Sequence, residues 1–228
     1  MTAVISLSKI NLIESNNKYI LKNINLDINK SDCIVFSGHN GAGKTTLFKI
    51  INGLIKPTSG NIKICDNTIN DKTKKRVGYV PQINKFEKNI PVSVRQAIQI
   101  GLFAKKGIFA KLSKQDNSFI EDIAKKLEIY HLLDTPVGKL SGGEMQKVSI
   151  ARVLAQEADI ILLDEPLSHL DTKSQKSIIK LIEDIHSIKK VTVLIILHSF
   201  EQKPECCNRI ITMENGEISE ERKIEKDV

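Results

Sequence analysis

The sequence predicts an α/β fold with a mainly parallel sheet, and two features lead to this prediction. The apolar runs at residues 33–36, 160–163 and 193–197 are short and continuous, as in parallel strands that are buried on both faces. The first run leads through a glycine-rich loop into a segment whose apolar residues follow helical spacing. A chain of 228 residues can bury a substantial core as one domain or as two subdomains.

The glycine-rich loop at residues 38–45 reads Gly-His-Asn-Gly-Ala-Gly-Lys-Thr, the pattern of a phosphate-binding loop. Its glycines let backbone N–H groups turn inward, and the next helix N-terminus adds partial positive charge suited to phosphate oxygens. Lys44 would reach the β- and γ-phosphates of a nucleoside triphosphate, and the Thr45 hydroxyl would bind Mg²⁺. The candidate nucleotide-binding residues here are Gly38, His39, Asn40, Gly41, Ala42, Gly43, Lys44, Thr45 and Thr46.

A second glycine-rich loop, Leu-Ser-Gly-Gly-Glu, occupies residues 140–144. Ser141 is a good helix N-cap, and the apolar residues behind it have the spacing of a helix. The loop therefore predicts a second helix N-terminus that can hold an anion. Its candidate binding residues are Ser141, Gly142, Gly143 and Glu144.

Two carboxylates, Asp164 and Glu165, follow the apolar run 160–163. A parallel strand delivers such residues to the carboxyl edge of its sheet, where α/β proteins bind their ligands. Asp164 is placed to hold Mg²⁺ and Glu165 to polarise an attacking water. A strand that simply ends in solvated acids is the alternative interpretation.

Together these motifs resemble those of the ATP-binding-cassette (ABC) ATPases, and the resemblance covers nearly the whole chain. Gln82 resembles the Q-loop glutamine of that family, residues 168–171 resemble the D-loop, and His198 resembles the switch histidine. The resemblance implies catalytic roles for Glu165, His198 and Gln82, and a contact of Asp171 with the nucleotide. It also implies that Gln82 joins the two expected Mg²⁺ ligands, Thr45 and Asp164.

The resemblance further implies a single ABC ATPase domain over residues 1–228, with the fold of a P-loop NTPase. Residues 1–87 and 159–228 would form the nucleotide-binding core, with its mainly parallel sheet and an antiparallel β subdomain. Residues 88–158 would form an inserted α-helical subdomain that carries the second glycine-rich loop.

Weaker patterns predict the remaining elements. We expect strands at 4–7, 20–28, 61–64 and 191–197, helices at 93–103 and 115–130, and a final pair of strands at 209–213 and 217–219. Asn215-Gly216 forms the turn of that pair. The charged tail, residues 220–228, is expected to fray.

In the family, the phosphate loop of one copy meets the second glycine-rich loop of another across a head-to-tail dimer that encloses ATP. A γ-phosphate needs more positive partial charge than one helix end supplies, which favours this arrangement. The expected partners are therefore a second copy, integral membrane permease subunits and, indirectly, an extracytoplasmic metal-binding protein. The chain would lie on the cytoplasmic face of the cell membrane.

Composition agrees with this location. No apolar stretch approaches the roughly 18–20 residues of a membrane span. The net charge of +7 could attract nucleic acid, but the lysines are scattered among only seven Phe and three Tyr residues, so no nucleic acid partner is expected. The adjacent Cys206 and Cys207 are expected to be a reduced pair, with a metal or redox role as the alternative.

Four positions depart from the usual family pattern. His39 stands where proline is commoner, and Lys147 replaces a frequent arginine. Ser199 follows His198 where aspartate is common, so the partner that orients the histidine is open. Ser15 falls where an adenine-stacking aromatic residue is expected, and Tyr19 comes four residues later.

Residues 76–82 and 89–94, with the segment 107–116, resemble the zinc and manganese branch of metal-ion importers. The alternatives are a siderophore or cobalt importer, an exporter, or an ABC ATPase that acts on nucleic acid or ribosomes. The DNA-repair type carries a long coiled coil between the two loops, for which this chain has no room. The ribosome type carries two cassettes, and this chain has one.

The segment 82–110 mixes apolar side chains with lysines and begins at Gln82, so we expect a short cytoplasmic helix of the permease to dock beside it. The alternative is ordinary core of the helical part. The apolar residues in question are Ile83, Phe86, Ile90, Val92, Leu102, Phe103, Ile108 and Phe109.

Overall fold

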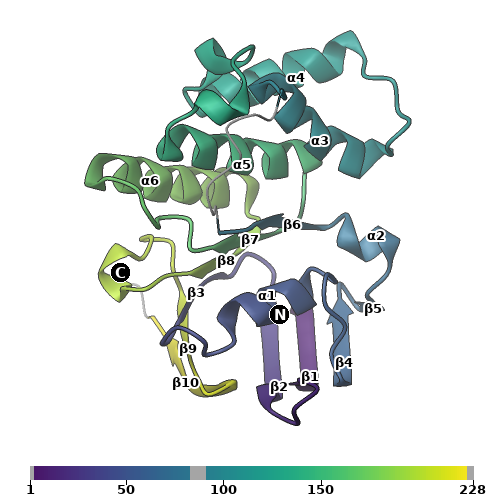
Figure 1. Cartoon of the computed structure of the whole chain (residues 1–228), viewed down its shortest axis with the longest axis vertical. Helices are drawn as coiled ribbons and strands as arrows, with labels where there is room; N and C mark the ends of the chain where they lie inside the picture. The colour runs from purple at the N-terminus through teal and green to yellow at the C-terminus, as the bar shows by residue number, and fades with distance from the viewer. Residues whose placement is uncertain (1–2, 83–90, 225–228) are drawn as a thin grey trace.

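A computed structural model of the chain describes residues 3–82 and 91–224 (Figure 1). Its larger sheet has the strand order β10-β9-β3-β8-β7-β6. All neighbours in it are parallel except the last hairpin, β9–β10. The bounds are β3 (Cys33–Ser37), β6 (Val77–Val80), β7 (Ile160–Asp164), β8 (Thr192–Ile196), β9 (Arg209–Glu214) and β10 (Glu217–Lys223).

The second sheet is antiparallel, with the order β2-β1-β4-β5. Its strands are β1 (Ala3–Ile13), β2 (Tyr19–Asn29), β4 (Ser59–Ile64) and β5 (Asn67–Thr68). The helices are α1 (Lys44–Ile51), α2 (Asp71–Lys74), α3 (Val94–Lys106), α4 (Lys114–Lys126), α5 (Gly142–Gln156) and α6 (Thr172–Lys189). In Figure 1, α1 lies between the two sheets, whereas α5 and α6 cover the opposite face of the larger sheet and α3 and α4 lie beyond them.

The two faces of the larger sheet enter two separate hydrophobic cores, which explains the continuous apolar runs. In β3, Cys33 and Val35 face the core shared with α3, α5 and α6, while Ile34 and Phe36 face the core shared with α1 and the antiparallel sheet. Successive side chains of a strand point to opposite faces, so both faces require apolar residues. The predicted α/β class and mainly parallel sheet are confirmed.

The chain between β6 and β7 carries α3, α4 and α5, although β6 and β7 themselves pair in parallel, Val77 opposite Ile160. A helical segment is thus inserted between two neighbouring strands. The boundaries at 88 and 158 stay a prediction. None of the helices in the described ranges is long and apolar enough to cross a membrane.

Two predicted segments were wrong in extent. The helix expected at 115–130 ends at Lys126, because Glu128 adopts a left-handed backbone with φ of 59°, and residues 130–132 form one turn of 3₁₀ helix. The tail expected to fray from residue 220 remains in β10 as far as Lys223. Its pairing with β9 is reinforced by Glu221, whose Oε1 lies 2.6 Å from Nη2 of the buried Arg209.

Candidate active site

The phosphate-binding loop connects the end of β3 to the start of α1. Three of its glycines adopt positive φ, at 132° for Gly38, 83° for Gly41 and 99° for Gly43. A Cβ added to Gly38 would lie 2.0 Å from the carbonyl oxygen of Met213 on β9, so only glycine fits there. The loop is therefore pressed against the sheet.

Lys44, the first residue of α1, holds this loop in shape. Its side chain is buried, and its Nζ donates hydrogen bonds to the carbonyl oxygens of Gly38 at 2.7 Å and His39 at 2.9 Å. Burial lowers the pKa of Lys44, while the charges of Glu165 and Asp164 act in the opposite direction. A buried cation is thus held against the glycine-rich loop, an arrangement suited to a phosphate.

Asp164, the last residue of β7, is almost completely buried and both of its oxygens accept hydrogen bonds. Thr45 Oγ1 donates to Oδ1 at 3.0 Å, and the Tyr79 hydroxyl donates to Oδ2 at 2.9 Å. Burial raises the pKa of Asp164, and the two hydrogen bonds oppose that shift. Burial, followed by the charge of Asp164, also raises the pKa of Tyr79.

The oxygen pair of Thr45 and Asp164 fits a magnesium ion. Mg²⁺ prefers oxygen ligands at about 2.1 Å in an octahedron, so two neighbouring ligands lie about 3 Å apart. The observed separation of 3.0 Å between Thr45 Oγ1 and Asp164 Oδ1 meets this requirement. Mg²⁺ usually keeps several waters, and two protein oxygens at the edge of a cavity therefore suffice.

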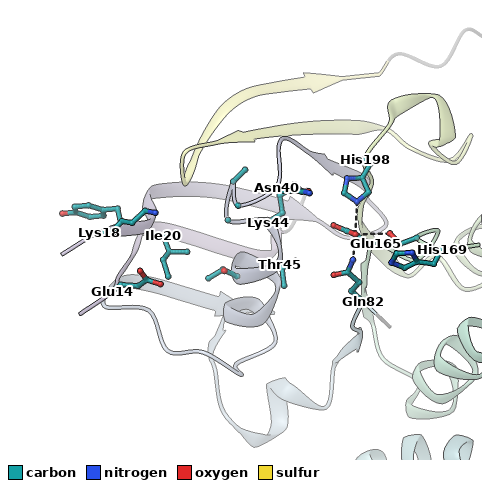
Figure 2. Close-up of a pocket in the computed structure, with 16 residues that line it drawn as sticks. Glu14, Lys18, Ile20, Asn40, Lys44, Thr45, Gln82, Glu165, His169 and His198 are labelled. Atoms are coloured by element: carbon teal, nitrogen blue, oxygen red, sulfur yellow. Dashed lines mark hydrogen bonds and ion pairs between the residues drawn. The ribbon is translucent and has the colours of Figure 1, made fainter. Parts of the chain in front are cut away.

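Three segments of the chain, at Gln82, residues 165–168 and His198, converge at Glu165 (Figure 2). Its Oε2 accepts hydrogen bonds from Gln82 Nε2 at 2.6 Å and from Ser168 Oγ at 3.0 Å, and it lies 2.9 Å from His198 Nε2. Glu165 itself has a positive φ of 49°, which is uncommon for a non-glycine residue. The strained backbone and three polar contacts hold this carboxylate at the carboxyl edge of the sheet.

A cavity of about 820 Å³ joins these groups. The phosphate loop forms its middle, and Glu165, Gln82 and His198 form one end (Figure 2). The other end is bordered by the start of β2 and the turn before it. The lining residues are Glu14, Lys18, Tyr19, Ile20, Asn40, Gly41, Ala42, Gly43, Lys44, Thr45, Thr46, Gln82, Glu165, Ser168, His169 and His198.

The structure brings most of the predicted residues together, but not all of them. Gly38 and His39 line a neighbouring cavity, and His39 is exposed. Gln82 donates to Glu165, so its contact with Mg²⁺ stays a prediction. Among the described residues that line the main cavity, none comes from the second glycine-rich loop, residues 141–144.

That second loop and Asp171 form the N-termini of two other helices. Ser141 caps α5 in a capping box with Glu144. Asp171 caps α6, where its Oδ1 accepts hydrogen bonds from the backbone N–H groups of Lys173 and Ser174 at 3.0 Å each. The two helix ends approach each other, since a Cβ added to Gly143 would lie 2.9 Å from Ser174 Oγ.

Several lining residues were not among the predicted site residues. Tyr19 lines the cavity, whereas Ser15, the position aligned with the expected aromatic, does not. Ser168 lies in the predicted D-loop, and its spacing three residues after Glu165 could have indicated the contact. Tyr79 does not line the cavity, but its hydroxyl donates to Asp164, and its place in the motif that precedes Gln82 could have indicated a role. Nothing in the sequence around Glu14 and Lys18 indicates that these two residues line the cavity.

Comparison with known proteins supports the same assignment. The chain matches the ABC transporter family over residues 21–168. The high-affinity zinc uptake system ATP-binding protein ZnuC of Bacillus subtilis is 32% identical over 199 residues, or 87% of this chain and 86% of that protein. The manganese transport system ATP-binding protein MntB of Halalkalibacterium halodurans is 31% identical over 213 residues, or 93% of this chain and 84% of that protein.

A solved structure agrees with these sequence matches. The dimeric structure of MJ0796, a bacterial ABC transporter cassette, matches with a TM-score of 0.82 and 28% identity, over 98% of this chain and 100% of that one. The family match spans well over half of the chain, and both relatives exceed 30% identity over most of their length. The chain therefore belongs to the ABC transporter family and is an ATP-hydrolysing, ATP-binding member of it.

Proposed function

We propose that this chain is the ATPase subunit of an importer for a divalent metal ion, zinc or manganese. The observation that carries the proposal is the likeness to relatives named for zinc uptake and manganese transport, over most of both lengths. The chain would bind ATP and Mg²⁺, hydrolyse ATP and pass the resulting movement to membrane partners. It would lie peripherally on the cytoplasmic face of the cell membrane.

The site within one chain has groups suited to binding phosphate, binding Mg²⁺ and taking up a proton. Lys44 and the N-terminus of α1 would bind the phosphates, and Thr45 and Asp164 would hold Mg²⁺, which would neutralise phosphate charge. Glu165 acts as the general base that takes a proton from the attacking water. Gln82 and His198, both in contact with its Oε2, hold the carboxylate in position.

Two copies of the chain would complete the site. The cavity in one chain has the phosphate loop but, among its described lining residues, no contribution from Ser141, Gly142 or Gly143. A head-to-tail dimer would bring these residues and Asp171 of a second copy to the nucleotide. The γ-phosphate would hold the two copies together, and its loss on hydrolysis would release them.

Permease subunits and, through them, an extracytoplasmic metal-binding protein complete the proposed transporter. The loop between α3 and α4 offers a contact surface, because Ile108 is 77% exposed and Phe109 is 93% exposed. Leu102 was wrongly included in that surface, because it is a buried residue of the helical core. Ile83, Phe86 and Ile90 lie outside the described residues.

Among the described residues, no group of three or more His, Cys, Asp and Glu side chains is arranged to hold a metal ion. In the proposed transporter, the membrane and extracytoplasmic partners recognise the transported ion. The chain itself would supply only nucleotide-driven movement.

Metal uptake by cells tests the proposal. In a strain from which the gene for this chain is deleted, uptake of radioactive zinc or manganese should fall, and the wild-type gene should restore it. Phe109→Glu should lower uptake and co-purification of the permease while ATP affinity is unchanged. Ile188→Glu is the matched control, because this side chain is 78% exposed on α6. Normal uptake of both ions in the deletion strain would reject metal import.

A further inference from the structure

Two cysteines that lie far apart in the sequence come into contact beside the larger sheet. The Sγ atoms of Cys33 and Cys206 are 3.2 Å apart. A disulfide places its two sulfurs about 2.05 Å apart, so the remaining gap is on the order of 1 Å. The structure describes all four cysteines of the chain, and each of them is a thiol.

The backbone around the two thiols is held by several hydrogen bonds. The backbone N–H of Asn208 donates to the carbonyl oxygen of Cys33 at 2.9 Å, and the backbone N–H of Cys33 donates to Asn208 Oδ1 at 2.9 Å. The side-chain amide of Asn208 also donates to Asp32 Oδ1 at 2.9 Å. Because Cys206 lies two residues before Asn208, these bonds hold the segment that carries Cys206 beside the start of β3.

The neighbouring cysteines are directed elsewhere. The Cys207 thiol is buried and donates to the carbonyl oxygen of Arg209 at 3.2 Å. Cys65 packs against the other core, the one shared with α1 and the antiparallel sheet. The geometry therefore selects Cys33 as the partner of Cys206, and not the adjacent Cys207.

The two sulfurs differ in their access to solvent. Cys33 is fully buried, whereas Cys206 is half-buried. An oxidant from solvent therefore meets Cys206 first. The contact with the Cys206 thiol, together with burial, raises the pKa of Cys33.

We propose that Cys33 and Cys206 form a reversible disulfide when a hydroperoxide oxidises the protein. The Cys206 sulfur attacks one peroxide oxygen, the O–O bond breaks, and a sulfenic acid and one water are formed when the oxidant is hydrogen peroxide. The Cys33 sulfur then attacks the Cys206 sulfur, the S–O bond breaks, and the proton of Cys33 leaves with the hydroxide as a second water. The two sulfurs together give two electrons to the peroxide, and a dithiol returns them.

The position of this pair connects it to the nucleotide site. Cys33 opens β3, the strand that leads into the phosphate-binding loop. Cys206 lies in the segment between His198 and β9. The disulfide would join the strand behind the phosphate loop to the segment behind the switch histidine.

Peptide mapping by mass spectrometry tests the proposal on the full chain. The reduced protein is treated with hydrogen peroxide in native buffer, alkylated and digested. We expect a cross-linked peptide that contains Cys33 and Cys206 and disappears after treatment with dithiothreitol. Cys206→Ser and Cys33→Ala should lose this product, whereas Cys207→Ser and Cys65→Ser, the matched controls, should keep it. A Cys206–Cys207 product, or Cys206 sulfinic acid with Cys33 still open to alkylation, would overturn the proposal.

Thermal unfolding provides a second measurement that does not depend on the folding of any variant. A cross-link between such distant residues restricts the unfolded chain, so the oxidised wild-type protein should melt several degrees above the reduced protein. Dithiothreitol should remove the difference. An equal melting temperature before and after oxidation would contradict a disulfide within one chain.

Discussion

The two helix N-termini that we expect to meet ATP, those of α1 and α5, differ in how their backbone N–H groups are satisfied. At α1, the N-cap residue is Gly43, with a φ of 99° and no side-chain cap. At α5, the N-cap residue is Ser141, whose hydroxyl accepts a hydrogen bond from the N–H of Glu144. Glu144 Oε2 in turn accepts hydrogen bonds from Ser141 N at 2.8 Å and Ser141 Oγ at 2.7 Å.

This difference distinguishes a site that is ready for an anion from one that is not. The free N–H groups of α1 and the Lys44 ammonium leave positive potential for a phosphate. The α5 end already holds a carboxylate, and the hydrogen bonds from Ser141 lower the pKa of Glu144. A γ-phosphate that approaches α5 must therefore displace the contacts of Glu144. We infer that α1 binds nucleotide in the single chain and that α5 contributes only when two chains close.

Glu165→Gln is expected to have the largest effect of these variants. It should slow hydrolysis and so preserve the ATP-bound dimer, in which the N-terminus of α5 would contact the nucleotide. General bases typically contribute about 10²–10⁴-fold to a rate, so hydrolysis should fall by a factor of this order while ATP still binds. The measurements are steady-state phosphate release and sedimentation with ATP and Mg²⁺, which should show a dimer. Hydrolysis at the wild-type rate would rule out Glu165 as the base.

Ser141→Arg in the Glu165→Gln background tests the role of the α5 end directly. The variant should bind ATP as a single chain nearly as well as Glu165→Gln does, because Ser141 does not line the cavity. It should not form the ATP-dependent dimer in sedimentation, because a long cation replaces the cap where the second copy must fit. A stable ATP-bound dimer of the double variant would argue against contact of the α5 end across the dimer.

Lys44→Ala tests the α1 end. Hydrogen bonds to charged groups contribute roughly 1.5–3 kcal/mol, so ATP affinity should fall about 10- to 100-fold. Calorimetric titration with ATP and Mg²⁺ measures the change. Lys147→Ala is the control, because its Nζ lies 3.0 Å from Glu128 Oε2, away from the cavity, and its affinity should match the wild type. An unchanged dissociation constant for Lys44→Ala would show that Lys44 does not bind the phosphates of ATP.

Local patterns were sufficient to predict the parts of the site that lie on one short segment. The phosphate loop follows the buried strand β3, and the two acids stand at the end of the buried strand β7, so their neighbours in sequence are also their neighbours in space. The fold class followed for the same reason, since both faces of β3 and β7 require apolar side chains. The N-cap at Ser141 was also predicted, because a serine stands before apolar residues with helical spacing.

Contacts between distant segments could not be read in this way. The sequence did not predict which residue orients His198, because Ser199 stands where aspartate is usual. In the structure, Glu165 is in contact with His198. The contact of Cys33 with Cys206 depends on how β9 is positioned beside β3, which no local pattern records. The end of α4 was misplaced because apolar spacing continues beyond Lys126 while the backbone changes at Glu128.

Tyr19→Ala tests whether an aromatic side chain binds the base at the far end of the cavity, away from the N-termini of α1 and α5. Tyr19 lines the cavity but is 46% exposed, and Ser15 offers no aromatic surface. A base–aromatic stack contributes about 1–3 kcal/mol, and the exposure of Tyr19 favours the lower end, about a fivefold loss of affinity. Because a stack of this kind tolerates different bases, the wild type should bind ATP and GTP with similar affinity and the variant should lose both equally. A strong ATP preference that survives Tyr19→Ala would assign the base to another contact.

Of these variants, Asp164→Asn is expected to have the smallest effect, a change in melting temperature. It compares the contribution to stability of the carboxylate beside α1 with that of the carboxylate at α5. Burial raises the pKa of Asp164, so its protonated form is favoured in the folded chain; its contribution to stability is greatest at low pH and is lost as the pH rises through the raised pKa. The ionised carboxylate is thus a cost at neutral pH, and Asn removes that cost while it can still bond to Tyr79 and Thr45. We expect the variant to melt a few degrees higher at pH 7, with a gain that shrinks toward pH 4, and to hydrolyse ATP more slowly. Glu144→Gln should behave in the opposite way, because the lowered pKa of Glu144 stabilises the fold above the ordinary glutamate pKa. A melting temperature of Asp164→Asn below the wild type at pH 7 would mean that the hydrogen bonds of the carboxylate outweigh its burial.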